Sequence, residues 1–475
     1  MKAHWVIAGL LALCAALPAR AETNPFLIHP GQMKFAPLKF DPPKPVRKVL
    51  SNGIVVYLLE DHEIPVVNLY AYARGGYYLC PEAKAGIDDI YGTLLRTGGT
   101  KTLKPDALND ELEFMPAYIT TGMGGEHCTA SLDALTKDLP RALEIFADVL
   151  LHPDFDAAKL DLRKKQIVEG LRRWNDDAGS ILGREFHRLM YAGHPFGTVA
   201  TTSSVNGVTR EDLFALHEKC WYADNVLMGV AGDFSTDQMV KDLERLFAEW
   251  KPRGKPLPPP PEVTDNREKG LYYIEKDTTQ TKIEMGLIGI TRDDPDFFAL
   301  DVMDNVLGGN SFASRLVKEV RSNRGLAYSV NSSFSGGRLR GVVEEFCGTK
   351  PKSTVEALTV MRQITADLAK TPPGPDELAV AKDSILQAQA FSFTSASKIV
   401  WRQVFYEAEG MPPDYLTRYF TAIEKVSSED VARVAKRLLN LDKMIVLVVG
   451  NQKEFDKPLS TLGPVKVRPL ENFDR

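Results

Sequence analysis

Apolar positions divide the chain into short strand-like runs and longer helix-like segments. In the first part, residues 54–59 and 66–72 are rich in β-branched and aromatic residues, and the turns Asn52-Gly53 and Gly75-Gly76 bound them, which is typical of strands. Apolar residues at helical spacing predict helices near 86–96, 138–151, 156–174, 178–191 and 209–220. Because strands precede helices rather than alternating with them, the pattern favours an α+β arrangement over a parallel Rossmann sheet.

A proline-rich segment divides the chain in two. Six prolines lie between Trp250 and Glu262, and they forbid helix and central strand and favour a stiff extended spacer. On either side, an amphipathic helix is followed by an apolar run that ends in glycine, at 226–232 and again at 444–450. A tandem duplication explains this repetition most simply. We therefore expect the two runs to occupy equivalent positions in two similar α+β domains.

The beginning of the chain predicts export. Lys2, an apolar run over 5–17 and the sequence Pro18-Ala19-Arg20-Ala21 are typical of a signal peptide, with cleavage expected after Ala21. A lipoprotein attached at Cys14 is the alternative, although bulky Leu13 precedes this cysteine. Neither the run at 5–17 nor any later segment is long and apolar enough to span a bilayer. The expected location is periplasmic or secreted.

The predicted organisation has five parts. They are a signal peptide (1–21), an N-terminal extension (22–45), an N-terminal domain (46–250), a proline-rich linker (251–266) and a C-terminal domain (267–475). The chain has 58 basic and 63 acidic residues, and removing Lys2 and Arg20 leaves 56 against 63, a net charge of −7. That balance gives no general attraction for nucleic acid or for anionic lipid.

Four cysteines remain after cleavage, and their pairing is open. Export permits disulfides, but four cysteines allow three complete pairings, and buried free thiols are an equal alternative. The four are Cys80, Cys128, Cys220 and Cys347.

The segment 86–95 carries the most informative chemistry. Its apolar residues recur at helical spacing and form one face, which leaves Asp88, Asp89, Gly92 and Thr93 on another side. Taken alone, this segment is an ordinary half-buried helix whose polar side faces solvent.

The surrounding motifs change that interpretation. They are Arg96-Thr-Gly-Gly-Thr-Lys-Thr102, Asp148-Val-Leu-Leu-His-Pro-Asp-Phe155, His194-Pro-Phe-Gly197, Trp221-Tyr-Ala-Asp-Asn225 and Gly229-Val-Ala-Gly-Asp233. In this order they resemble the insulinase/pitrilysin metallopeptidase superfamily, and most closely its bacterial two-domain subunits, which are similar to the mitochondrial processing peptidase subunits. The resemblance covers nearly the whole mature chain. It implies two tandem homologous domains, each a mainly antiparallel sheet packed with helices, that face one another across a cavity.

The zinc motif of that family is degenerate in this sequence. The family carries H-x-x-E-H on one helix, in which two histidines bind zinc and the glutamate is the general base, with a distant glutamate as third ligand. The corresponding residues here are Asp89, Gly92 and Thr93, whereas the distant ligand is kept as Glu169. Thr93 is a poor zinc ligand, Gly92 has no base, and two carboxylates fall short of three protein ligands. We expect no metal, no intact catalytic residue and no hydrolysis by this chain alone.

No other segment replaces the lost motif. Glu126-His127-Cys128 offers three ligand types in a row, but on a strand His127 points away from its two neighbours. The remaining histidines are scattered over unrelated segments and are expected to be surface or packing residues. They include His62, His152, His187, His194 and His217.

The second half keeps a different part of the family's machinery. Residues 310–325 and the strand-like 326–330 match the family's second-domain signature, in which an Arg and a Tyr face the active site. They are Arg321 and Tyr328 here, and the resemblance implies that they donate hydrogen bonds to the substrate carbonyl. Taken alone, the two residues are more typical of a solvated helical arginine and a half-buried strand tyrosine, and the intact signature around them favours the functional interpretation.

These features favour a non-catalytic subunit of an exported zinc metallopeptidase that acts on peptides. Zinc is then expected in a partner subunit with an intact H-x-x-E-H, in a heterodimer. The alternative is a stand-alone peptide-binding or scaffold protein. An active zinc peptidase is the third interpretation, which the degenerate motif opposes.

Overall fold

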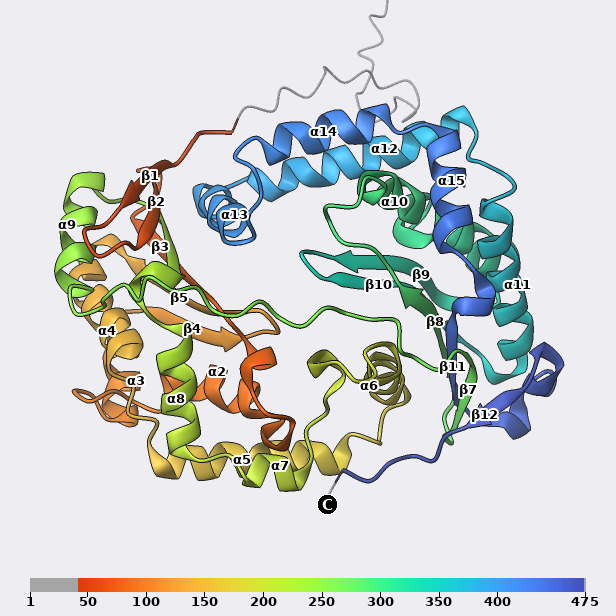
Figure 1. Cartoon of the computed structure of the whole chain (residues 1–475), viewed down its shortest axis with the longest axis horizontal. Helices are drawn as coiled ribbons and strands as arrows, with labels where there is room; N and C mark the ends of the chain where they lie inside the picture. Colours follow the sequence, from red (N-terminus) through yellow and green to blue (C-terminus); the bar gives the residue numbers. More distant parts are fainter. Residues whose placement is uncertain (1–41, 474–475) are drawn as a thin grey trace, which may run out of the picture. The chain divides into compact units, whose positions relative to one another are not determined.

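A computed structural model describes residues 42–473, and each half of this part contains one six-stranded sheet (Figure 1). The predicted signal peptide and most of the N-terminal extension lie outside the described residues. Across the first sheet the order is β1 (Val46–Val49), β2 (Val55–Glu60), β6 (Val226–Gly232), β3 (Val66–Arg74), β5 (His127–Leu135) and β4 (Tyr118–Met123). Across the second it is β12 (Val465–Val467), β7 (Gly270–Glu275), β11 (Ile445–Gly450), β8 (Thr281–Ile288), β10 (Arg340–Thr349) and β9 (Ala327–Gly336).

The two sheets have matching positions for the repeated apolar runs. β6 and β11 are each third in the order of their sheet, and both are buried along their whole length. Each is parallel to one neighbour, β2 or β7, and antiparallel to the other, β3 or β8. The remaining pairings are antiparallel except β7 with β12. The predicted mainly antiparallel α+β fold and the equivalence of the two runs are confirmed.

The helices follow the predicted pattern closely. In the first half they are α2 (Ile87–Thr97), α3 (Pro105–Phe114), α4 (Leu139–Leu151), α5 (Ala157–Arg173), α6 (Ala178–Met190), α7 (Thr202–Asn206), α8 (Arg210–Cys220) and α9 (Thr236–Leu246). In the second they are α10 (Phe297–Asp304), α11 (Thr354–Leu368), α12 (Pro375–Ala390), α13 (Ala396–Ala408), α14 (Tyr415–Lys425) and α15 (Ser428–Leu438). Capping boxes begin α8 at Thr209 and α15 at Ser427, and the predicted start of the first of these helices at 209 is within one residue of the observed start.

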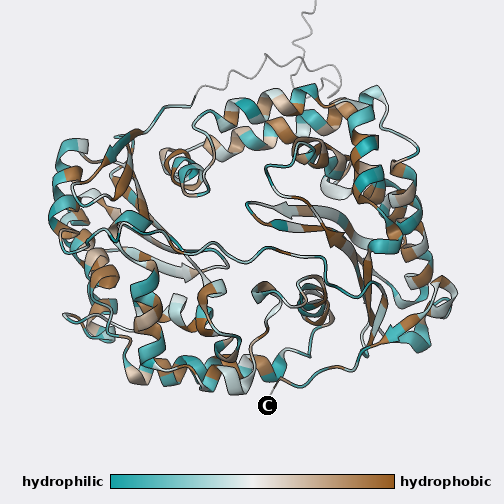
Figure 2. Ribbon diagram, viewed as in Figure 1, coloured by the Kyte–Doolittle hydropathy of each residue, from teal (hydrophilic) through white to brown (hydrophobic). Residues whose placement is uncertain are grey.

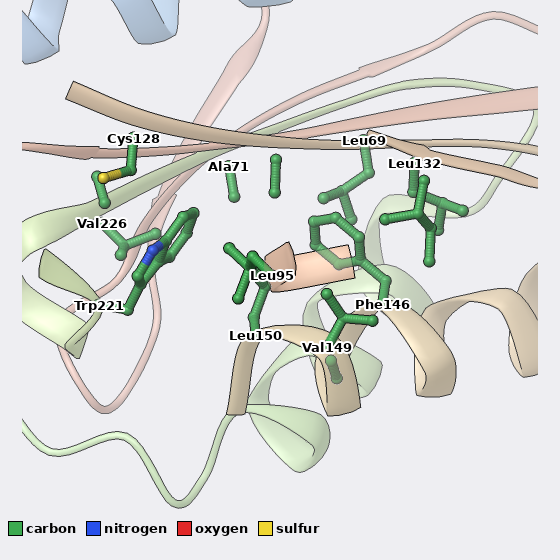
Figure 3. Close-up of a cluster of buried hydrophobic side chains, with 14 of the residues drawn as sticks. Leu69, Ala71, Leu95, Cys128, Leu132, Phe146, Val149, Leu150, Trp221 and Val226 are labelled. Carbon is green, nitrogen blue, oxygen red and sulfur yellow. The ribbon is translucent and has the colours of Figure 1, made fainter. Parts of the chain in front are cut away.

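The first sheet buries one face against helices. Leu69 and Leu132 from neighbouring strands point toward Leu95, Phe146 and Val149 (Figure 3), and all five are fully buried. Burial alternates along β5, as expected for a strand with one covered face. A second apolar core covers the corresponding face of the other sheet, and hydrophobic residues concentrate on the strands and on one side of the covering helices (Figure 2). No helix within 42–473 meets the length and hydropathy needed to cross a membrane.

Each half contributes one helix to the other half's sheet. α6 packs on β8 and β11, where Phe186 joins an apolar cluster with Ile288 and Leu447. In return, α13 packs on β2, β3 and β6, where Val400 and Val404 are buried. Figure 1 shows α13 beside the first sheet and α6 beside the second. This exchange holds together segments that are more than 90 residues apart in the chain.

Gly229 is the point of closest approach between α13 and the first sheet. A Cβ atom there would lie 2.4 Å from Val400 Cγ1 and 2.9 Å from Val404 Cγ2. We expect Gly229→Ala to lower the free energy of unfolding by about 1–3 kcal/mol, because overpacking displaces the helix. Urea denaturation measures the loss. Gly183→Ala on α6 is the matched control, because its Cβ would meet nothing within 4 Å, and equal destabilisation by both variants would contradict the prediction.

The proline-rich linker is extended and attached to the first half. No helix or strand forms within 251–266. Tyr78 Oη donates a hydrogen bond to the Pro258 carbonyl at 2.7 Å, and His194 Nε2 donates one to the Pro261 carbonyl at 3.0 Å. The segment is therefore an extended linker held in place by these hydrogen bonds, consistent with the stiff spacer that its prolines predict.

Candidate functional site

Asp89, which the sequence resemblance assigns to the family's first zinc-binding histidine, is exposed in the first turn of α2. Arg163 of α5 donates two hydrogen bonds to Asp89 Oδ1, from Nε at 2.7 Å and from Nη2 at 2.5 Å. The guanidinium neutralises the carboxylate and occupies one of its oxygens. A metal ion at Asp89 would have to compete with this ion pair.

Gly92, which the sequence resemblance assigns to the family's general base, is packed against β4. Its carbonyl accepts a hydrogen bond from Thr121 Oγ1 at 2.6 Å. A Cβ atom at Gly92 would lie 3.0 Å from the backbone nitrogen of Met123 and 3.1 Å from Gly122 Cα. The helix and the strand are thus too close for any side chain at this position unless one of them moves.

The residue pattern predicted that the polar side of α2 faces solvent, but in the structure most of this side is covered. Only Asp89 is exposed, whereas Gly92 is buried and Thr93 is half-buried. The reason is that β4, an edge strand of the sheet, covers this side of the helix. Asp88, beside Asp89, is half-buried, and this burial raises the pKa of its carboxyl group above the usual range.

Glu169, which the sequence resemblance assigns to the third ligand of the family, also pairs with arginines. Its Oε1 accepts hydrogen bonds from Arg173 Nη2 at 2.8 Å and Nε at 3.1 Å, and Arg172 lies 3.6 Å from Oε2. Thr93 bears a neutral hydroxyl. This donor set does not fit catalytic zinc, which takes three protein ligands from His, Glu, Asp or Cys. Among residues 42–473, no group of three or more His, Cys, Asp or Glu side chains is arranged to hold a metal.

The Glu126-His127-Cys128 segment is not a ligand cluster either. Cys128 is buried in the core, whereas His127 stacks on Tyr72 with ring centres 4.9 Å apart. Burial lowers the pKa of His127, and Glu126 pairs with Arg338 at 3.1 Å. The scattered histidines lie among unrelated partners, which include Asp233 for His62, Asp148 for His152, Tyr191 for His187, the Pro261 carbonyl for His194 and Tyr91 for His217.

Arg321 and Tyr328 are brought together at the free edge of the second sheet. Arg321 lies in a π-helical segment (Val317–Asn323), and Tyr328 lies on the edge strand β9. The Arg321 guanidinium carbon is 5.9 Å from the centre of the Tyr328 ring, and Tyr328 is 81% exposed. Within 42–473, neither side chain has a hydrogen-bond or ion-pair partner. Their donor groups are therefore available to another molecule.

The helical segment before this pair ends at two glycines. α10 continues into a π-helical turn (Asn305–Gly309), and the helical conformation ends at Gly309. A Cβ at Gly308 would lie 2.3 Å from the backbone nitrogen of Ser332 on β9. The glycine thus permits close packing on the strand that carries Tyr328, and π-helical turns are common at functional sites.

Comparison with known domain families covers both halves. Residues 82–201 match the family described as Insulinase (Peptidase family M16), and residues 207–385 match the Peptidase M16 inactive domain. The chain belongs to the insulinase superfamily. The second match includes Arg321 and Tyr328, and the first includes the degenerate helix and Glu169.

Some individual relatives are named as peptidases, and one is named as a non-peptidase. The chain is 26% identical over 341 residues to an uncharacterized zinc protease of Mycobacterium leprae, covering 70% of this chain and 74% of that protein. It is 23% identical to a non-peptidase homolog of Helicobacter pylori (86% and 94% covered) and 20% identical to the mitochondrial-processing peptidase subunit beta of Dictyostelium discoideum (89% and 90%). A solved Pseudomonas fluorescens structure, described as a peptidase M16 inactive domain, superposes with a TM-score of 0.77 at 26% identity, covering 86% of this chain and 98% of that one.

The altered ligands of this insulinase homologue lead to a direct prediction. We expect the isolated protein to bind less than about 0.1 zinc per chain and to cleave no unstructured peptide, because the residues that the resemblance assigns to two zinc ligands and the base are Asp89, Thr93 and Gly92. Metal analysis of protein prepared without chelators measures the zinc, and a fluorogenic peptide assay measures hydrolysis. About one zinc per chain together with chelator-sensitive hydrolysis would contradict it.

Proposed function

We propose that this chain is the non-catalytic subunit of an exported zinc metallopeptidase that acts on peptides. In this role it presents Arg321 and Tyr328 to a partner subunit that carries zinc on an intact H-x-x-E-H. One contrast supports the proposal most strongly. In the first half, the contact of Gly92 with β4 leaves no room for a side chain at residue 92 of the motif helix α2. In the second half, the Arg321–Tyr328 pair is exposed and has no hydrogen-bond or ion-pair partner within 42–473.

The chemistry of the pair suits the role. A tyrosine hydroxyl and a guanidinium both donate hydrogen bonds, and both stabilise a carbonyl oxygen on which negative charge develops. An arginine beside the ring also places a positive charge near that oxygen. Neither group needs to be deprotonated for this purpose, so the pair contributes without a metal or a base of its own.

The relatives support the partnership. A processing-peptidase subunit is by its name part of an assembly, and the similarity to it extends over 89% of this chain. The similarity to a protein named non-peptidase homolog supports the absence of independent hydrolysis. Export rests on the features of residues 1–21.

Identification of co-purifying chains tests the proposal. A C-terminal tag on the chain in its native cells, followed by mild crosslinking and mass spectrometry, should recover a second insulinase-superfamily chain with an intact H-x-x-E-H. The purified pair should cleave an unstructured peptide that neither chain cleaves alone. Recovery of the chain by itself, with peptide binding but no hydrolysis, would support the stand-alone peptide-binding or scaffold alternative.

A further inference from the structure

A cavity of about 530 Å³ lies where the proline-rich linker passes the first sheet. Its lining comes from distant parts of the chain, which include Arg74 at the end of β3, the linker over 254–259 and Arg338. Arg338 lies in the turn between β9 and β10, and this turn of the second half points toward the first half (Figure 1). Ligand sites in proteins have volumes of about 300–1,000 Å³, so the cavity is large enough to hold part of a ligand.

Three cationic side chains line this cavity, namely Arg74, Lys255 and Arg338. Arg74 donates from Nε to the Ala408 carbonyl at 3.2 Å, which leaves both of its terminal nitrogens without a partner within 42–473. Arg338 donates from Nη2 to Glu126 at 3.1 Å, and the Lys255 ammonium group has no partner in the described part of the chain. The cavity therefore offers guanidinium and ammonium donors to another molecule.

The cavity has an excess of positive charge although the chain is acidic. Asp224 also lines it, and its two carboxylate oxygens accept hydrogen bonds from the backbone nitrogens of Arg253 at 2.8 Å and Gly254 at 2.7 Å. Asp224 and Glu126 together balance two of the three cations, which leaves one positive charge, whereas the whole chain has a net charge of −5. A local excess of this kind favours an anionic group of a ligand.

Other parts of the wall are aromatic and aliphatic. Tyr78 and Tyr222 contribute rings to it, and Leu257 contributes an aliphatic side chain. The Tyr78 hydroxyl donates to the Pro258 carbonyl at 2.7 Å, which holds the linker in this place. A peptide has both parts that these walls suit, a carboxylate for the cations and a carbon-rich chain for the rings, whereas a small inorganic anion has only the first.

We propose that this cavity binds a carboxylate group of a peptide, either its C-terminus or the side chain of an Asp or Glu. Arg74 and Arg338 donate hydrogen bonds to the carboxylate oxygens, and Lys255 adds a positive charge beside them. Because Arg74 belongs to the first half and Arg338 to the second, one bound carboxylate contacts both halves. The inference rests on the proposed function, since it assumes that the chain holds peptides, and it adds a preference for peptides with an acidic group.

Isothermal titration calorimetry on the full chain tests the proposal with three short N-acetylated peptides of Gly, Ser and Leu. One has a free C-terminal carboxylate, the second is the same sequence amidated, and the third is the amidated sequence with one internal Glu. We expect the first or the third to bind at least about tenfold more tightly than the neutral second, as a charge-assisted hydrogen bond allows. The peptide that does so identifies the source of the carboxylate. Equal affinity of all three, or no binding of any at about 1 mM, would overturn the assignment.

Variants of the cavity locate the carboxylate. Arg74→Gln and Lys255→Gln should each reduce the difference between the charged and the neutral peptide, and the double variant should abolish it. Lys251→Gln is the matched control and should keep the difference, because Lys251 lies on the same linker but bonds to the Ala248 carbonyl at 3.0 Å outside the cavity lining. An undiminished difference in the double variant, or an equal loss in the control, would overturn the assignment. If the cavity variants fail to fold, the three peptides on the unaltered chain still decide it.

The outcome is separate from that of the proposed function. Calorimetry measures binding by this chain alone and needs neither a partner nor hydrolysis. Equal binding of the three peptides would remove the carboxylate site and leave the subunit role to be judged by co-purification.

Discussion

Tyr328→Phe is expected to lower kcat of the reconstituted complex by about a hundred- to a thousand-fold, which is typical of the loss of one oxyanion donor. The variant removes the hydroxyl and keeps the ring beside Arg321. Since such donors act mainly in the transition state, kcat should fall more than KM rises. Arg321→Lys should also lower kcat, because an ammonium does not reproduce the planar guanidinium. Initial rates with a fluorogenic peptide give both parameters.

A second exposed tyrosine provides the control for this prediction. Tyr118 lies on β4, the edge strand of the other sheet, and is 68% exposed. Tyr118→Phe therefore makes the same chemical change on a comparable strand, and we expect a normal kcat. Gel filtration must show that each variant assembles with the partner. A near-normal kcat in Tyr328→Phe and Arg321→Lys, with assembly intact, would make the chain a scaffold rather than part of the active site.

Restoring the family motif should destabilise the protein rather than create a zinc enzyme. The triple variant Asp89→His, Gly92→Glu, Thr93→His places a glutamate where a Cβ already lies 3.0 Å from the β4 backbone. We expect it to lose about 3 kcal/mol or more of unfolding free energy, because the strand or the helix must move. Urea denaturation measures the loss, and metal analysis measures any zinc gained.

The double variant Asp89→His, Thr93→His separates packing from chemistry. It leaves Gly92 in contact with β4, and its positions are exposed and half-buried, so we expect a loss of only about 1 kcal/mol. A triple variant that is as stable as the double variant and binds one zinc would show that α2 can accommodate a glutamate at residue 92. The comparison between the two variants isolates the effect of residue 92.

Much of the fold was predictable because local signals agree with one another. The helices at 157–173 and 210–220 begin at side-chain caps, Asp156 and Thr209, and carry apolar residues at helical spacing. The runs at 226–232 and 444–450 are apolar throughout, as central strands buried on both faces must be. Such features depend on near neighbours in the chain, so the sequence alone reveals them.

The parts that were not predictable depend on contacts between distant segments. Nothing near residues 86–95 indicates that β4 covers Gly92, because that contact comes from the pairing of β4 with β5. The exchange of α6 and α13 is equally hidden, since both helices are amphipathic whichever sheet they cover. Resemblance to the family is what indicates Arg321 and Tyr328 as site residues in the sequence, and only the fold shows that they are adjacent and exposed.

The exchange of helices has a consequence for synthesis. The ribosome completes α6 more than 250 residues before it completes β11, the strand on which Phe186 and its neighbours pack. Until that strand exists, β8 covers only part of the apolar side of α6, and the first sheet lacks α13 until residue 408 has been made. Neither half can reach its final packing before nearly the whole chain has been made. A nascent chain of this kind therefore keeps apolar surface exposed until late in translation, and such surface makes a folding intermediate prone to aggregation.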